Sequence, residues 1–255
     1  MSGAVVVTAV EGVGEVGAGE RIGGLIAAGL GRTGVEPRDG DVIVVSQKVV
    51  SKAEGRTREL ATVEPGPRAR KLAGELGRDP RLVELVLAES RRVVRAAAGV
   101  LITETHGGWI CANAGIDSSN LPTDELVTLL PLDADVSARR IRAELVAHTG
   151  TRPGVLIADS FGRPWRIGQA DVAIGCAGIN ALDDWRGRAD AHGRALAATV
   201  VAVADELAAA ADLARTKTSA TPAVHVRGAE RWWTAEDGPG AAATLQRPER
   251  EDLFR

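Results

Sequence analysis

The sequence contains no tyrosine, two phenylalanines and five tryptophans among its 255 residues. Proteins that bind single-stranded nucleic acid stack bases on aromatic side chains, so this shortage argues against such a platform. Basic residues are not in excess either, because 31 Lys and Arg face 34 Asp and Glu, for a net charge of −3. A general nucleic-acid or membrane-surface role needs a basic face that meets phosphates, and we therefore expect neither partner.

Cysteine and long apolar runs are also scarce. The chain has two cysteines, Cys111 and Cys176, which are too few for a zinc site or a disulfide framework, and we expect both to be small buried hydrophobes. The N-terminal residues lack a basic segment followed by a long apolar one, and no later stretch reaches the ~18 apolar residues of a membrane-spanning helix. These absences predict a soluble, cytoplasmic protein.

The stretch that carries most chemistry is VLIADSFGRPWRIGQ, residues 155–169. Its first four residues form a short apolar, β-branched run that is typical of a buried strand. Asp159 and Ser160 would then lie at the carboxyl end of this strand, where they can meet a ligand. Pro164 predicts an extended or turn geometry after them, because proline has a fixed φ and no N–H.

Two arginines, Arg163 and Arg166, flank this turn. Arginine captures phosphate or carboxylate groups with two parallel hydrogen bonds, whereas carboxylate oxygens suit Mg²⁺ or Mn²⁺. The pattern therefore indicates a site for an anion and its metal. A surface turn with a structural Arg–Asp pair explains the same residues about equally well.

Two other segments have related chemistry. In SQKVVSKAEGR, residues 46–56, Lys48 and Lys52 lie four apart just beyond an apolar run, where they can meet nucleotide phosphates, although the segment lacks the order of a P-loop. In residues 113–120, Asp117 stands among amide and hydroxyl groups after another apolar run. Each segment alone is also explained by a solvated turn. If Asp117 and Asp159 converge, however, they form a site for a hard cation.

Strands and helices follow one another irregularly along the chain. We expect strands at residues 42–45, 169–175 and 224–227, a helix capped by Asp135 that runs to about Thr149, and the longest helix at residues 194–215. Because the order is not a strict alternation of strand and helix, we predict an α+β fold with mixed sheets and packed helices, not a doubly wound one.

Five stretches together resemble the coenzyme F420:L-glutamate ligase family, and they occur in the same order across nearly the whole chain. They are GDVIVVSQKVVSKAEGR, ANAGIDSSN, LLPLDADVSARRIR, DSFGRPWRIGQADVAIGCAGI and VAVADELAAAADL. The resemblance implies an F420 ligase-like fold and an intertwined homodimer. It also implies a GTP-dependent ligase that joins L-glutamate to coenzyme F420-0 and then adds further glutamates by gamma-linkage, through an acyl phosphate, releasing GDP and phosphate. Mg²⁺ or Mn²⁺, two ions in all, would be needed, with K⁺ as a further candidate.

Carried over to this sequence, the resemblance makes Asp117 and Asp159 catalytic metal ligands and places Ser160 at or near a second metal. Nucleotide contacts would come from Gly12, Val13, Gly14, Glu15, Gln47, Lys48, Lys52 and Asn120. The chain departs from archaeal members at Thr216-Lys217-Thr218-Ser219, where they resemble one another with a Gln and a Glu, and Lys217 would there meet phosphate. Our own hypothesis is that Arg163 and Arg166 hold the anionic acceptor or the incoming glutamate.

The resemblance runs from about Val5 to Gly228, and we expect residues 1–228 to form the catalytic domain, with residues 229–255 as a tail or linker. The ending EDLFR resembles the junction to a flavin-reductase-like second domain in actinobacterial relatives, so this chain can be one domain of a longer protein. Two rival functions stay open, namely another nucleotide-dependent carboxylate–amine ligase and a non-catalytic module that binds GTP or a deazaflavin. A product assay with candidate acceptors separates them.

Overall fold

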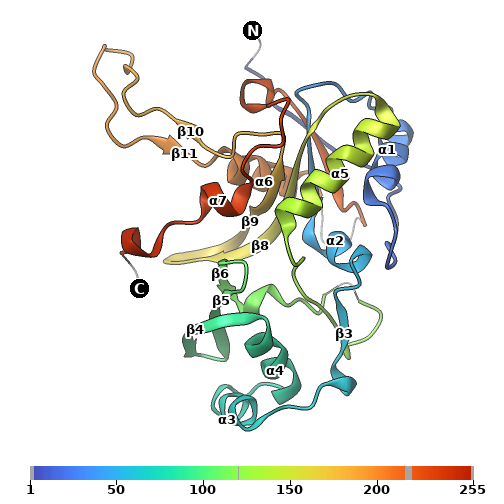
Figure 1. Ribbon diagram of the computed structural model, residues 1–255, viewed down its shortest axis with the longest axis vertical. Coiled ribbons are helices and arrows are strands. Elements are labelled where there is room, and N and C mark those ends of the chain that lie inside the picture. Colours follow the sequence, from blue (N-terminus) through green and yellow to red (C-terminus); the bar gives the residue numbers. More distant parts are fainter. Residues whose placement is uncertain (1–2, 120, 216–219, 254–255) are drawn as a thin grey trace.

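The computed structural model describes residues 3–119, 121–215 and 220–253, and its main feature is a mixed sheet (Figure 1). Within the described residues this sheet has five strands in the order β1-β12-β2-β8-β9. Strand β2 is parallel to β8, and the other neighbours are antiparallel, so β1, β2 and β8 run in one direction. The strands span Val6–Ala9 (β1), Val42–Ser46 (β2), Gly154–Arg163 (β8), Arg166–Ala177 (β9) and Ala223–Arg227 (β12).

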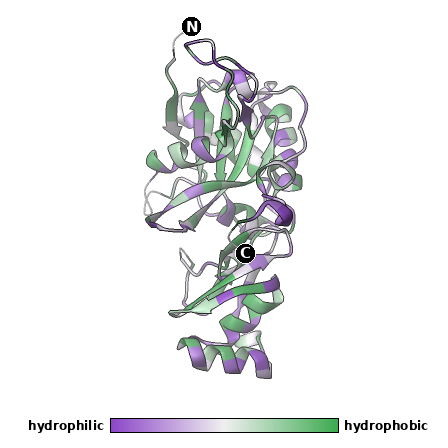
Figure 2. Ribbon diagram, turned by 90° about the vertical axis from the view of Figure 1, so that its left-hand side faces the viewer, coloured by the Kyte–Doolittle hydropathy of each residue, from purple (hydrophilic) through white to green (hydrophobic). Residues whose placement is uncertain are grey.

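Helices cover both faces of this sheet, which explains why its central strands are apolar at consecutive positions. Successive side chains of a strand point to opposite faces, so Ile43 and Val45 pack in one core and Val42 and Val44 in the other. Figure 2 shows these strands as the green interior of the larger part of the molecule. The first face is covered by α1 (Ile22–Thr33), α2 (Gln47–Ala53) and α5 (Ala134–Thr149), and the second by α6 (Val203–Leu213) and α7 (Ala241–Leu245).

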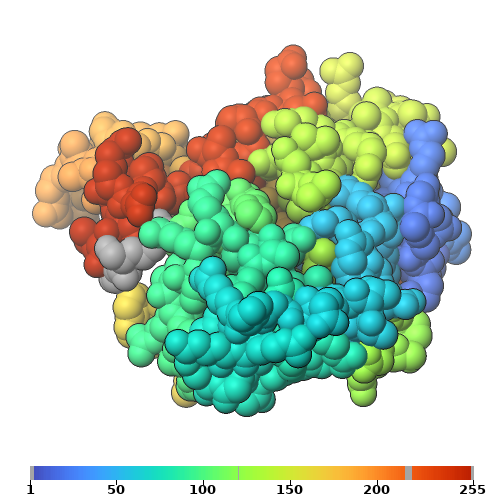
Figure 3. All heavy atoms as spheres, turned by 60° about the horizontal axis from the view of Figure 1, so that its bottom comes forward, coloured from blue at the N-terminus to red at the C-terminus, as the bar shows by residue number. Residues whose placement is uncertain are grey.

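Residues 57–128 form a second region, which we call the small lobe. It has its own core of Ala69, Val83, Leu101 and their neighbours, and it faces the viewer in Figure 3. Its helices are α3 (Pro67–Leu76) and α4 (Pro80–Ala88), and β4 (Ser90–Ala97), β5 (Val100–Thr105) and β6 (Ile110–Ala112) form one sheet. Two short strands, β3 (Thr57–Glu59) and β7 (Leu126–Thr128), pair with each other and join the lobe to the sheet.

The prediction of a mixed α+β fold is confirmed, but two helix predictions were wrong. Residues 194–202 are not helical, because β-branched Val200 and Val201 form strand β11 and pair with Asp183 and Asp184 of β10; only Val203–Leu213 forms a helix, and α5, with 16 residues, is longer. The cap of α5 is Asp133, whose carboxylate accepts from the Val136 amide at 2.9 Å. Asp135 lies inside the first turn instead.

After residue 228, Ala229, Trp232, Ala241 and Leu245 pack on the second face of the sheet. The buried Asp135 carboxylate accepts from the backbone amides of Cys176 (2.8 Å), Ala241 (2.7 Å) and Ala242 (3.1 Å). This carboxylate therefore ties α7 to both α5 and β9. Division of the chain at residue 228 stays a prediction. No helix among the described residues has the length and apolar character that crossing a membrane requires.

Candidate functional site

One end of the five-stranded sheet collects most of the residues that the sequence singled out. Because β1, β2 and β8 run in the same direction, their carboxyl ends meet there, which is where ligands bind in open α/β sheets. The loop after β1, helix α2 directly after β2, and the part of β8 beyond Ala158 all lie at this end. Ala158 is the last residue of β8 that pairs with β2.

Helix α2 contributes an amide and two lysines. Gln47 is fully buried; its Oε1 accepts from Ser51 Oγ at 2.9 Å, and its Nε2 has no hydrogen-bond partner among the described residues. Lys48 Nζ lies 2.9 Å from Asp117 Oδ2 and also donates to Ser119 Oγ. One turn later, Lys52 Nζ lies 2.9 Å from Glu15 Oε2. Both lysines are therefore held by carboxylates from other segments.

The loop after β1 meets this helix through Glu15 and through Gly19, whose backbone amide donates to the Ala53 carbonyl at 2.8 Å. Gly12 and Gly14 have positive φ angles of 71° and 74°, a conformation that glycine adopts without strain. The Gly12 carbonyl accepts from Arg32 Nη2 at 2.5 Å. The side chain of Val13 packs in the core of the first face, so only its backbone can face a ligand.

Asp117 lies just after the small lobe's β6, and its position is fixed on two sides. Its backbone N–H and C=O both pair with Thr128, and its Oδ1 accepts from the Ser119 amide at 2.6 Å. Burial alone would raise the pKa of this carboxyl, but the hydrogen bonds from Lys48 and Ser119 outweigh it and hold the pKa below its ordinary value. Asp117 is therefore ionised at neutral pH.

Asp159 lies in β8 on the face that Ile157 and Phe161 share. Burial, together with the negative charges of Asp117 and Asp171, raises the pKa of Asp159 to about 7, against the opposing effects of a Ser160 hydrogen bond and Lys48. Such mutual effects require that these groups lie close together. The structure thus brings Asp117, Lys48 and Asp159 into one cluster, although they are far apart in sequence.

Ser160 points the other way. As the next residue along β8, it faces the side of the sheet that α6 covers, where its Oγ donates to Asp171 Oδ1 at 2.6 Å. Asp171 also pairs with Arg215. Neither Asp171 nor Arg215 was predicted from the sequence as a site residue, although a carboxylate inside an otherwise apolar strand was a usable signal.

Arg163 and Arg166 are not part of this cluster. They close the hairpin between β8 and β9, where Arg163 donates to the carbonyls of Ile167 (2.9 Å) and Gly168 (3.3 Å) in its own turn. Arg163 lies four positions along the strand from Asp159, roughly 13 Å away. The hairpin tip emerges beyond the small lobe in Figure 3. Strand β8 therefore does not end at Asp159 and Ser160 as expected, because pairing with β9 carries it on to Arg163.

Two further predicted contacts, Asn120 and Lys217, lie outside the described residues. Among the residues that the structure does describe, no group of three or more His, Cys, Asp or Glu side chains could hold a metal. Mg²⁺ is nevertheless often held by one or two carboxylates together with substrate phosphates. Asp117 and Asp159 supply such oxygen donors from two different segments, Asp117 after β6 and Asp159 in β8. The oxygen donors of Asp117 and Asp159 therefore fit a bound divalent cation.

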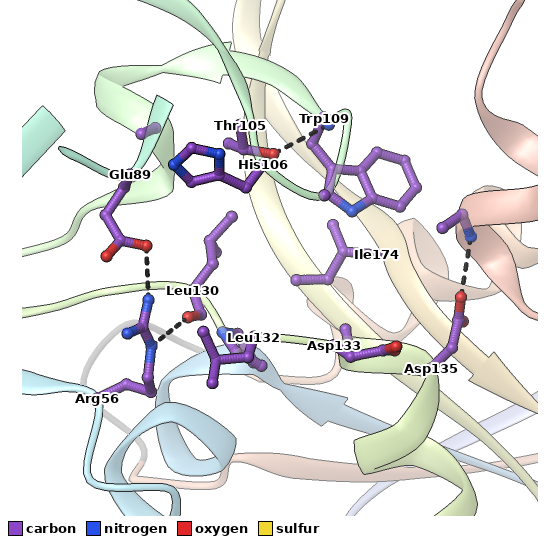
Figure 4. Close-up of a pocket in the computed structure, with 15 residues that line it drawn as sticks. Arg56, Glu89, Thr105, His106, Trp109, Leu130, Leu132, Asp133, Asp135 and Ile174 are labelled. Atoms are coloured by element: carbon purple, nitrogen blue, oxygen red, sulfur yellow. Dashed lines mark hydrogen bonds and ion pairs between the residues drawn. The ribbon is translucent and has the colours of Figure 1, made fainter. Parts of the chain in front are cut away.

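A cavity of about 190 Å³ between the small lobe and the sheet region is a separate feature (Figure 4). Trp109, Leu130 and Ile174 line it, and its charged groups are paired with protein: Arg56 bonds to Glu89 at 2.5 Å, and Asp135 holds α7. None of the residues predicted for the site lines it. We therefore regard this cavity as a gap in the packing between the two regions.

Comparison with known proteins shows the family of this chain. The family model described as F420-0:Gamma-glutamyl ligase matches residues 12–228. The coenzyme F420:L-glutamate ligase of Methanothermobacter thermautotrophicus is 44% identical over 247 residues, covering 96% of this chain and 97% of the relative. The proteins of the same name from Methanopyrus kandleri and Halobacterium salinarum are 43% and 44% identical and cover 86% and 90% of this chain, and 87% and 92% of their own lengths. The chain therefore belongs to the F420-0:gamma-glutamyl ligase family.

Proposed function

We propose that the protein joins L-glutamate to coenzyme F420-0 with consumption of GTP, and that it adds further glutamates by gamma-linkage. The observation that carries this proposal is the cluster of Lys48, Asp117 and Asp159 at the carboxyl ends of parallel strands. Membership in the family supports the acceptor and the amino acid. The carboxylates of Asp117 and Asp159 and the lysines of α2 support a triphosphate bound with a divalent cation.

The reaction needs an activated acid, because a free carboxylate acylates amines poorly. A carboxylate oxygen of the acceptor attacks the γ-phosphorus of GTP, the bond from that phosphorus to the β-phosphate oxygen breaks, and GDP leaves. The amine of glutamate then attacks the acyl carbon, phosphate leaves, and the nitrogen loses a proton. A bound Mg²⁺ or Mn²⁺ would neutralise charge on the phosphates, and K⁺ is a further candidate cation.

The chain's own residues have distinct roles in this scheme. Asp117 and Asp159 would hold the divalent cations, with Ser160 near a second one. Lys48 and Lys52 would position the phosphates as mobile point charges. The turns around Gly12 and Gly14 allow a nucleotide to approach the backbone between Gly12 and Glu15. Gln47 has an amide nitrogen without a described partner that a nucleotide oxygen can satisfy.

One assay tests the reaction. The protein is incubated with F420-0, GTP, L-glutamate and Mn²⁺, and product mass is recorded; F420-0 labelled with ¹⁸O in its carboxylate should pass one ¹⁸O to the released phosphate. Asp117→Asn and Asp159→Asn should abolish turnover, whereas Asp124→Asn, an exposed aspartate of the same segment, should not. Product without isotope transfer would refute the acyl phosphate. Failure of the wild type to form product would refute the ligase, leaving a binding module or another acceptor.

Arg163 and Arg166 would hold the anionic acceptor or the incoming glutamate. Alanine at either position should raise the Michaelis constant for that substrate and leave GTP binding unchanged. Because both arginines lie on an exposed hairpin, a substrate must extend from the aspartates to the tip, or the tip must meet another copy of the chain. Unchanged kinetics in both variants would refute this role.

The proposal includes an intertwined homodimer. Its support is the hairpin tip, where Trp165 is 79% exposed and Ile167 is 99% exposed, together with the projecting arm that carries β10 and β11 (Figure 1). Burying two such side chains against a second copy removes apolar surface from water. Trp165→Ser with Ile167→Ser should shift the mass measured by analytical ultracentrifugation from dimer to monomer.

The predicted cytoplasmic location is also part of this proposal, and cell fractionation would check it.

A further inference from the structure

Strand β9 carries a buried carboxylate that the proposed mechanism does not use. Asp171 is 2% exposed and lies directly opposite Ser160 in the β8–β9 register. One of its oxygens, Oδ1, accepts from Ser160 Oγ at 2.6 Å, and the other, Oδ2, accepts from Arg215 Nη2. A buried carboxylate is costly unless it is both hydrogen-bonded and paired with a positive charge, and Asp171 has both.

Arg215 reaches this carboxylate from just beyond the end of α6. Its side chain is 10% exposed, and its Nε lies 3.5 Å from Asp212 Oδ1. The guanidinium thus supplies the countercharge for Asp171 and ties the end of α6 to β9. Its Nη1 is buried and has no hydrogen-bond partner among the described residues.

The hydrogen bond to Asp171 decides what Ser160 can offer a ligand. A serine hydroxyl has one proton and two lone pairs. The short bond to Oδ1 uses that proton, so any further group that binds Oγ must be a donor or a cation. Donation to a carboxylate also increases the negative charge on Oγ, and outer partners of this kind orient metal-binding groups and raise their basicity.

We propose that Asp171 is a positioning residue that holds Ser160 Oγ as an oxygen donor for a divalent cation. This inference rests on the proposed function, which places Ser160 near a second metal. Asp171 does not itself touch the cation; it acts through Ser160, and Arg215 keeps it in place. The competing explanation is that Asp171 and Arg215 only fasten α6 to the sheet.

A double-mutant cycle on Mn²⁺ binding separates the two explanations. Free Mn²⁺ is measured by electron paramagnetic resonance in the presence of GTP, for the wild type, Asp171→Asn, Ser160→Ala and the double variant. Loss of an outer partner typically weakens metal binding by about 10- to 100-fold. Asp171→Asn should weaken binding of the second Mn²⁺ by that factor in the wild-type background. When Ser160 is already alanine, the same substitution should weaken this binding by less than about threefold.

The matched control is Asp212→Asn, which removes the other carboxylate near Arg215 and leaves the Ser160 contact in place. It should keep Mn²⁺ affinity within about twofold, because the proposed effect passes through Ser160. An equal loss for Asp171→Asn in both backgrounds, or a lowered melting temperature with unchanged Mn²⁺ binding, would overturn the proposal in favour of a fastening role.

A second comparison keeps the proposal testable if Asp171→Asn does not fold. Ser160→Ala should lose the second Mn²⁺, whereas Ser160→Thr, which retains a hydroxyl, should recover most of the affinity. Wild-type affinity in Ser160→Ala would refute the inference. The wild-type product assay is independent of this outcome. If the wild type forms product but the effects of the two substitutions on Mn²⁺ binding are additive, only the role of Asp171 is refuted. If the wild type forms no product, the proposed ligase activity is refuted.

Discussion

Replacement of Asp159 by asparagine should stabilise the metal-free protein while it removes activity. Burial is the main cause of the pKa of about 7 at this carboxyl, and the charges of Asp117 and Asp171 add to it. Between pH 4 and pH 7 the native chain therefore retains a proton that the unfolded chain releases. Stability then falls as pH rises through this range, and the full penalty is present above pH 7.

The size of this penalty follows from the shift. Relative to the ordinary value of 3.8, a pKa of about 7 corresponds to a ceiling of about 4 kcal/mol, at about 1.4 kcal/mol per pH unit. Asp159 is partly exposed, so solvent screening reduces the effect, and we expect about 2 kcal/mol. For a chain of this size, that amount raises the melting temperature of Asp159→Asn by about 4 to 8 °C.

The measurement is thermal unfolding of both proteins with a chelator, at pH 5 and at pH 8. The advantage of the variant should be larger at pH 8, because asparagine has no proton to lose. Addition of Mn²⁺ should stabilise the wild type more than the variant and narrow the gap. Equal melting temperatures at pH 8, or a gap that does not change with pH, would refute the assigned burial and charge of Asp159.

Three further predictions concern stability. Asp135→Ala should lower the free energy of unfolding by about 3 to 5 kcal/mol, because three backbone amides lose a charged acceptor, and hydrogen exchange should accelerate in α7. Gly175→Ala should cost about 1 to 3 kcal/mol, since its Cβ would lie 2.4 Å from the Ala134 carbonyl oxygen, whereas Gly162→Ala, which meets nothing within 4 Å, should be neutral in the same denaturant titration. Burial opposes ionisation of Asp41, but hydrogen bonds from His225 and Arg227 hold its pKa well below the ordinary value. Its contribution to the free energy of unfolding is therefore present at neutral pH and is lost in acid. Asp41→Asn should lower the free energy of unfolding at pH 7 by about 3 to 5 kcal/mol in chemical denaturation, and it should reduce the loss of stability on acidification.

Much of the sheet region could be predicted from local patterns. The apolar runs before Gln47 and Asp159 indicated buried strands because both faces of β2 and β8 are covered by helices. Helical spacing misled only at residues 194–202, where leucine and valine recur at helical intervals but Val200 and Val201 pair with β10. A short β-branched run next to a helix cannot be assigned by periodicity alone.

The site was partly predictable, and the resemblance to the family is confirmed. Asp117, Asp159 and Lys48 could be selected from the sequence because each follows an apolar run, and the structure brings them together. The contact between Ser160 and Asp171 could not be predicted. A two-residue hairpin with Arg163 opposite Arg166 would pair Ser160 with Gln169, but an irregularity between Gly162 and Arg163 shifts the register by two residues and brings Asp171 opposite.

The two lysines of α2 are already occupied, since Lys48 pairs with Asp117 and Lys52 with Glu15. An anion that binds at this helix must therefore replace a carboxylate of the protein as the partner of a lysine, because neither ammonium group is unpaired. Exchange conserves the number of ion pairs, so salt should weaken such binding less than it weakens capture by unpaired lysines. The resting protein thus keeps its positive charges neutralised from within, and a cation that takes over Asp117 frees Lys48 at the same moment.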